Sequence, residues 1–262
     1  MLRPVAAVLV AVLALSACGD DTVRIGFRPR EGTQYTYRVE VESTTVTLVE
    51  GRAPVRQHDR FVLRAVHDVL AVGDGSSRVR VRLRAGDGAS RQYVVRLDRA
   101  GQLAEVQSIE GLPARALGSL GLTEIFPAAA GAPPDRPLGP GDRWPVDAPV
   151  ELPGQSATRL RGSGRLASLG VVGGREVGTV ENRLVLTVRG TSALTTGRFR
   201  LDGRQTTTST ATHALADGAV EEVDAVTRGR FRLTLLPPDD TGGPPVPGTL
   251  QIEIRSRTRR LD

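Results

Sequence analysis

Strict alternation of apolar and charged residues is the feature that most restricts how this chain can fold. From Arg78 onward, arginines at every second position alternate with Val79, Val81, Leu83 and Ala85. A period of two places the apolar side chains on one face of a β-strand and the guanidiniums on the other. The pattern therefore predicts a sheet with one buried face and one solvated face.

The same alternation recurs along the chain between short turns rich in glycine and aspartate. It predicts a mainly β fold with one or more curved antiparallel sheets, either a half-barrel or barrel-like. In the first half, a strand around 35–42 is followed by a meander of expected strands at 61–72, 77–85, 91–97 and 103–107. In the second half, the expected strands are 158–169, 174–189, 195–215, 219–235 and 249–257.

Two stretches break the strand pattern. Residues 111–126 carry apolar side chains at roughly helical spacing, which predicts one short helical segment. Residues 127–153 are rich in proline, which the interiors of strands and helices disfavour, so we interpret them as an extended connector. We expect a first β half over 22–126 and a second over 154–262, packed together as one domain.

The N-terminus has the three parts of a secretory signal. Arg3 supplies a positive charge, an apolar run continues to Leu15, and the small residues Ser16 and Ala17 precede Cys18. The run is shorter than the roughly 20 apolar residues that a transmembrane helix needs. Leu15-Ser16-Ala17-Cys18 resembles the bacterial lipobox. This resemblance implies cleavage between Ala17 and Cys18, with a diacylglycerol on the new N-terminal cysteine.

Cys18 is the only cysteine in the chain. We predict that residues 1–17 are a lipoprotein signal peptide, that 18–21 are a lipidated tether, and that the protein is held on the extracytoplasmic face of the bacterial cell membrane. The alternatives are a plain secreted protein or a signal anchor in which Cys18 has no role. If the thiol carries lipid, no disulfide or thiolate metal site can form.

The positive charge does not indicate nucleic-acid binding. The formal net charge is +6, but the arginines are spread from Arg24 to Arg260 and aromatic residues make up only 3% of the chain. A nucleic-acid surface would concentrate arginine on one element, with aromatics on which bases stack. We interpret the arginines as a generic cationic surface, with one local cluster formed by Arg255, Arg257, Arg259 and Arg260.

No set of residues has the spacing of a catalytic or metal site. His58, His67 and His213 lack a second histidine at metal-ligand spacing. No serine stands in a Gly-x-Ser-x-Gly motif, and we read Gly162-Ser163-Gly164 as a turn. The remaining candidates are acidic, namely Glu221, Glu222 and Asp224 as a small cluster and Asp239-Asp240 as a weak calcium candidate. We predict no catalytic residue, no cofactor and no metal site, and expect no enzyme.

Trp144 is the only tryptophan and follows a Gly-Asp-Arg turn. It could serve as a ligand platform, but we favour a core residue that docks the connector onto the sheet.

Three features together resemble an uncharacterised family of actinobacterial lipoproteins. They are Cys18, the Gly-x-x-Tyr strand start within 32–37, and the Gly-Asp-x-Trp segment within 138–144. The resemblance implies a fold and a location, because the family has no established activity. More loosely, the layout looks like the lipid-carrying lipoproteins of mycobacteria and the periplasmic lipoprotein carriers, which enclose acyl chains in a half-barrel. Those carriers have several helices, whereas 111–126 is the only segment of this sequence that we expect to be helical.

These observations favour a membrane-anchored envelope lipoprotein that binds a lipid or another apolar ligand on a concave sheet. The alternative is a structural or interaction module that presents sheet edges and loops to envelope proteins.

Overall fold

The fold is a single antiparallel sheet. The computed structural model describes residues 22–73, 75–86, 88, 90–99, 101, 103–110, 133–150, 158–194, 197–237 and 243–261. The strands are β1 (Gln34–Val49), β2 (Val55–Gly73), β3 (Ser76–Ala85), β4 (Ser90–Asp98), β5 (Leu103–Glu110), β6 (Arg143–Val150), β7 (Thr158–Val172), β8 (Arg175–Leu194), β9 (Gly197–Ala214), β10 (Val220–Leu236) and β11 (Val246–Arg260).

The first and last strands meet in the middle of the sheet. The strand order is β5-β4-β3-β2-β1-β11-β10-β9-β8-β7-β6, so each half of the chain is a meander that runs outward from the β1–β11 pair. That seam runs from the pair Tyr37 and Arg260 to the pair Val49 and Gly248, over most of the length of both strands. β5 and β6 are the outer strands and are not paired with each other, so the sheet is open.

The predicted alternation is present and continues from strand to strand. Residues paired across the sheet form rows whose side chains share one face. One row of buried residues crosses six strands and consists of Val39, Thr258, Val223, Ala211, Val180 and Leu166. The next row points the opposite way and is polar, with Glu40, Arg257, Asp224, Thr210, Glu181 and Arg165.

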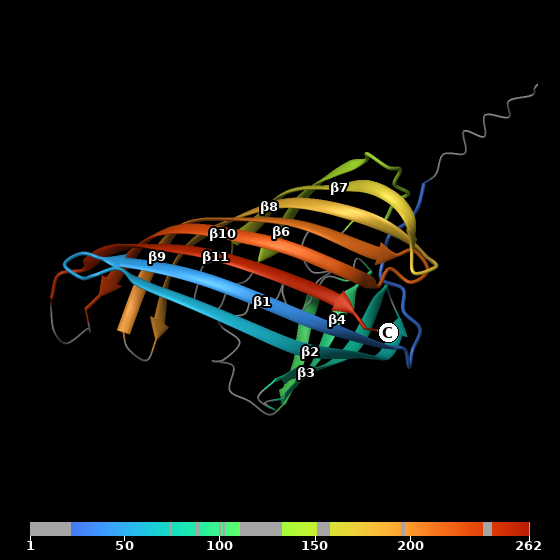
Figure 1. Ribbon diagram of the computed structural model, residues 1–262, viewed down its shortest axis with the longest axis horizontal. Coiled ribbons are helices and arrows are strands. Elements are labelled where there is room, and N and C mark those ends of the chain that lie inside the picture. Colours follow the sequence, from blue (N-terminus) through green and yellow to red (C-terminus); the bar gives the residue numbers. More distant parts are fainter. Residues whose placement is uncertain are drawn as a thin grey trace, which may run out of the picture.

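The buried face is the inner face of a curved sheet. Val81 on β3 and Val95 on β4 belong to the same core cluster as Val223 on β10. Strands this far apart in the order can share a core only if the sheet bends so that their buried faces meet. Figure 1 shows this curvature, with β3 and β4 passing behind the long strands β1, β11 and β10.

One end of the curved sheet is covered by the strap, which we define as residues 23–33. Its backbone bonds to distant segments: Val23 pairs with Leu138, the Phe27 N–H donates to the Arg99 carbonyl, and the Arg28 N–H donates to the Asp217 carbonyl. We call this the capped end. The opposite end, which holds the β1–β2 turn at Gly51, is the open end.

The structure refines two expectations. The expected helical segment at 111–126 lies outside the described residues, and the described residues contain no helix, so this expectation has no support. Part of the proline-rich connector forms the edge strand β6, which contains Pro145 and Pro149. An edge strand tolerates proline because one of its sides has no partner that needs an N–H. In the described part of the chain, no helix has the length and apolarity required to cross a membrane.

Candidate functional site

The inner face is filled by side chains toward the capped end. One cluster joins aromatic and aliphatic residues of β1 to β4 with residues of β9 and β10, including Tyr35, Val79 and Val95. A second cluster contains Leu138 and Leu166, both fully buried. These two clusters make up most of the hydrophobic core of the described structure and fill the capped end.

Trp144 belongs to the second cluster and is 5% exposed. Its indole ring lies over Gly164, where any Cβ would overlap the ring. The core role predicted for Trp144 is thus confirmed, but Gly162-Ser163-Gly164 is not a turn. The three residues lie within β7, and Gly164 supplies the space that the indole occupies.

Toward the open end, the inner face is still apolar, but more of its side chains are exposed to solvent. Phe61 is 39% exposed, and Ile252 and Ile254 are half-buried. Along β9 and β10 the same face carries the half-buried Leu201 and the buried Phe231. We call the following inner-face residues the apolar track: Phe61, Leu63, Leu201, Phe231, Leu233, Leu250, Ile252 and Ile254. The track continues the core as a surface that lies partly open.

A polar network closes the capped end around Asp217. The Tyr35 hydroxyl donates to Asp217 Oδ2 over 2.9 Å, and the Ala219 N–H donates to Asp217 Oδ1 over 2.9 Å. The Arg260 guanidinium lies 4.9 Å from the centroid of the Tyr35 ring and pairs with Glu221 at 3.0 Å. These contacts join β1 and β11 to the β9–β10 turn, so they fix the rim against which the strap lies.

The three histidines do not come together. His67 and His213 are buried on the inner face, and burial lowers the pKa of both, that of His67 to about 4. His213 Nδ1 lies 3.2 Å from the Gly218 carbonyl oxygen, and the His67 ring lies 4.9 Å from that of Tyr37. His58 lies on the exposed outer face beside Thr44 and Glu42. Buried histidines held neutral in this way act as core residues.

The acidic cluster is neutralised by arginines on neighbouring strands. Glu222 accepts hydrogen bonds from Arg259 and Arg257, which lower the pKa of its carboxyl. Asp224 lies 3.5 Å from Arg257. The sequence could not show this pairing, because it depends on the register between β10 and β11. In the described part of the chain, no group of three or more histidine, cysteine, aspartate or glutamate residues could hold a metal ion.

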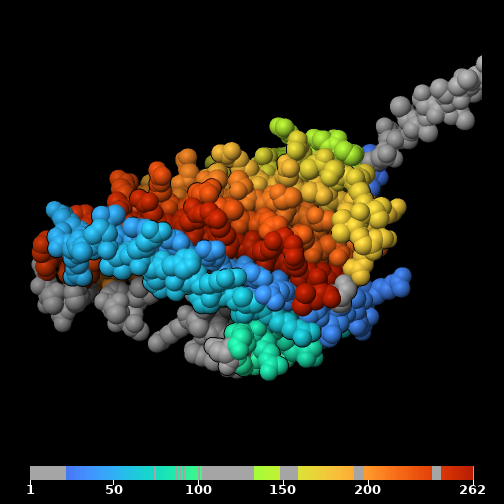
Figure 2. All heavy atoms as spheres, in the orientation of Figure 1, coloured from blue at the N-terminus to red at the C-terminus, as the bar shows by residue number. Residues whose placement is uncertain are grey.

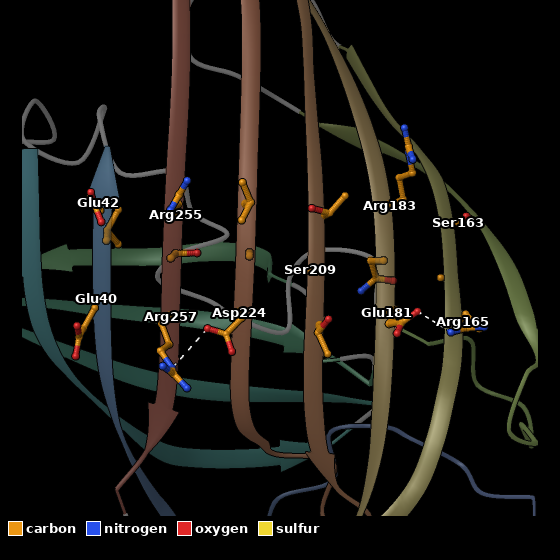
Figure 3. A pocket seen from close by; sticks show the side chains of 18 of the residues that line it. Glu40, Glu42, Ser163, Arg165, Glu181, Arg183, Ser209, Asp224, Arg255 and Arg257 are labelled. Atoms are coloured by element: carbon orange, nitrogen blue, oxygen red, sulfur yellow. Dashed lines mark hydrogen bonds and ion pairs between the residues drawn. The ribbon is translucent and has the colours of Figure 1, made fainter. Parts of the chain in front are cut away.

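A groove of about 840 Å³ crosses the outer face from β2 to β6. Figure 3 shows carboxylates and guanidiniums alternating along it, with ion pairs between Arg165 and Glu181 and between Arg257 and Asp224. Two lining arginines, Arg143 and Arg183, have no carboxylate partner among the described residues. The groove is therefore a polar surface that could accept a charged or hydroxyl-rich partner, in contrast with the inner face.

The remaining predicted residues lie outside the described residues. These are Ala17 and Cys18, at the expected cleavage and lipidation site, and the calcium candidates Asp239 and Asp240. Their roles stay predictions.

Comparison with known proteins identifies no family. No family model matches the chain, and no curated protein matches it. Among solved structures, it is similar to OmpT (in-vitro folded), an outer membrane protein of Vibrio cholerae, at 10% identity and a TM-score of 0.26, covering 90% of this chain and 99% of that chain. A loop L8 deletion mutant of OmpT matches at 9% identity and a TM-score of 0.20, covering 88% of this chain and all of that one. Scores this low carry no inference about fold or function.

Proposed function

We propose that this chain is a non-catalytic envelope lipoprotein, anchored through Cys18 to the extracytoplasmic face of the cell membrane, that holds a lipid or another apolar ligand on the inner face of its sheet. The proposal includes no cofactor, no metal and no nucleic-acid partner.

The observation that carries the ligand proposal is the apolar track. Apolar side chains on an inner face normally pack into a core, yet Phe61 is 39% exposed and Ile252 and Ile254 are only half-buried. Covering such surface is favourable by about 25 cal/mol for each Å² removed from water. An acyl chain or a similar apolar molecule along the track would gain this free energy without displacing the core at the capped end.

The proposed location rests on the signal-like N-terminus and the lipobox resemblance at Cys18. Two acyl chains give stable membrane attachment where one is marginal. The non-catalytic role is supported by the separation of the three histidines and by the arginines that neutralise Glu222 and Asp224.

One expression experiment tests both parts of the proposal. The full chain would be produced in a bacterium that processes lipoproteins, and the purified protein would be examined by mass spectrometry. We expect the N-terminal peptide to begin at Cys18 with a diacylglyceryl mass, and an organic extract to contain lipid near one molecule per protein. An intact or unmodified N-terminus would overturn the anchor, and repeated absence of lipid would overturn the ligand.

A pair of variants on β11 links the lipid to the track. Ile252→Glu places a charge on the inner face, whereas Gln251→Glu places the same charge on the outer face of the neighbouring position. We expect co-purifying lipid to fall several-fold in the first variant and to stay unchanged in the second. Equal retention in both would show that the lipid binds elsewhere.

The outer groove favours the alternative, an interaction module for envelope proteins. The guanidiniums of Arg143 and Arg183 would then pair with carboxylates of a protein partner. Crosslinking in native membranes from reactive groups placed at the groove would capture that partner, while the organic extract would contain no lipid.

A further inference from the structure

The capped end carries exposed apolar side chains at hairpin tips. Val171 and Val172, at the end of β7, are 67% and 57% exposed, and Val72 near the end of β2 is 47% exposed. The β7–β8 turn is formed by Gly173 and Gly174, both with positive φ, so the two valines form the last part of a tight hairpin. Single exposed valines are common on protein surfaces, so exposure alone does not indicate an interaction site. The place of this pair in the fold is what matters.

The start of the described chain lies at the same end. Val23 is fixed by two backbone hydrogen bonds to Leu138, of 2.9 and 2.8 Å. Cys18 precedes Val23 by five residues, which span at most about 18 Å whatever their conformation. Figure 2 shows the yellow β7–β8 hairpin and the dark blue start of the described chain at one end of the molecule, and the bright blue β1–β2 hairpin at the other.

The tether is thus too short for the capped end to move far from its anchor. If Cys18 carries lipid in a bilayer, Val23 lies within about 18 Å of the lipidated residue. The long strands then extend away from the membrane, and the open end of the apolar track lies on the distant side. The exposed β7–β8 hairpin then lies at the end of the body nearest the lipid.

We propose that the capped end is the membrane-facing surface of this protein, and that Val171 and Val172 enter the interfacial region of the bilayer. This inference rests on the proposed lipid anchor. The valines orient the anchored body but are too few to recruit it alone. Charge has a secondary role, because Arg175 beside the hairpin pairs with Glu221 at 3.0 Å and is followed by the exposed Glu176. The contact should therefore form on zwitterionic lipid as well.

The test supplies the anchor chemically, so it does not depend on lipidation in the cell. The chain from Cys18, which contains every described residue, would be coupled through its single thiol to a maleimide lipid in phosphatidylcholine vesicles whose acyl chains are brominated. Val172→Trp reports on the capped end. Leu48→Trp, at a position that is 41% exposed on the outer face near the end of β1, is the control at the open end and lies away from the apolar track. The native Trp144 is buried in both and gives a common background.

We expect bromine to quench the introduced indole at least twofold more in Val172→Trp than in Leu48→Trp. Equal quenching in the two variants, or stronger quenching in Leu48→Trp, would overturn the inference even if the cell lipidates Cys18. Conversely, an unmodified Cys18 in the expression experiment would remove the proposed anchor while leaving this orientation measurable. If Val172→Trp does not fold, as judged by circular dichroism, Val171→Trp takes its place with the same criterion.

Discussion

The two ends of the same long strands differ in how well their inner faces are covered. At the capped end, Leu166, Val79 and Val95 are completely buried and the strap lies across the rim. At the open end, the inner face of the same sheet carries Phe61 and Ile252, which remain partly exposed. Alternation supplies an apolar face along the whole strand. Toward the open end Phe231 and Leu233 are buried, but their neighbours on β2 and β11 are not. The difference indicates that the inner face is less tightly packed toward the open end than at the capped end.

The most direct test of this comparison is to truncate one leucine at each end of the inner face and to compare the losses of stability. Leu166→Ala should destabilise the protein by about 2–5 kcal/mol, because it leaves a cavity in a packed core. Leu250→Ala, on the half-buried part of β11, should cost about 1 kcal/mol, because little packing is lost. Urea denaturation of both variants measures the difference. Equal losses would mean that the two halves are equally packed.

Acid should weaken the capped end. Burial lowers the pKa of His67 to about 4, so the folded state leaves it neutral while the unfolded chain takes up a proton near pH 6.5. The unfolded state then binds more protons, and stability falls as pH drops from about 6.5 to 4, by about 3 kcal/mol from this residue. In His67→Gln, the difference in unfolding free energy between pH 7 and pH 4.5 should shrink. Part of the difference should remain, because burial also lowers the pKa of His213. An unchanged difference would contradict the assignment.

Alanine substitution at two glycines with similar φ angles tests how firmly the strap is held. Gly218 has a φ of 71°, and any Cβ there would overlap the Gly26 carbonyl of the strap. Gly51, in the open-end turn, has a φ of 72° with nothing near its Cβ position. Both substitutions by alanine incur the left-handed strain, of about 1 kcal/mol. Gly218→Ala should cost about 2 kcal/mol more, because the added Cβ overlaps backbone, and should make the strap susceptible to protease. Matching losses would argue that the strap is loosely held.

The smallest expected effect concerns the Asp217 network. Asp217→Ala removes the acceptor for the Tyr35 hydroxyl and for the Ala219 N–H, and should cost about 1–2 kcal/mol. Tyr35→Phe removes only one of these hydrogen bonds and should cost less. Thermal unfolding measures the loss of stability in each variant. A larger loss for Tyr35→Phe would be inconsistent with the two hydrogen bonds that Asp217 accepts.

The strands could be predicted from the sequence because arginine marks the outer face so regularly. The expected strands at 77–85, 91–97 and 174–189 correspond to β3, β4 and most of β8. β1 is longer than the expected 35–42, because Thr44 to Val49 lie where both faces are partly exposed and strict alternation is no longer required.

The curved antiparallel sheet and the meander from β2 to β5 were expected from the sequence, but the pairing of strands from the two halves could not be predicted. Alternation fixes which face a side chain occupies but not which strand lies beside it, so the β1–β11 pair was not foreseeable. The outer groove depends on the shape of the whole sheet, and the neutralised state of Glu222 depends on the register of β11. The apolar members of the track, by contrast, follow from the pattern, since Ile252 and Ile254 alternate with polar residues.

The β1–β11 seam has a consequence for when the chain can fold. Almost the whole described sequence separates the two strands that form the centre of the sheet, so native pairing must wait until the last strand has been synthesised. Contacts this distant in sequence close slowly, which keeps the incomplete chain unfolded for longer. If residues 1–17 are the proposed signal peptide, this delay would favour export, because translocation through a membrane pore requires an unfolded substrate. Loss of β11 would leave two separate meanders with unpaired inner edges, which are prone to aggregation.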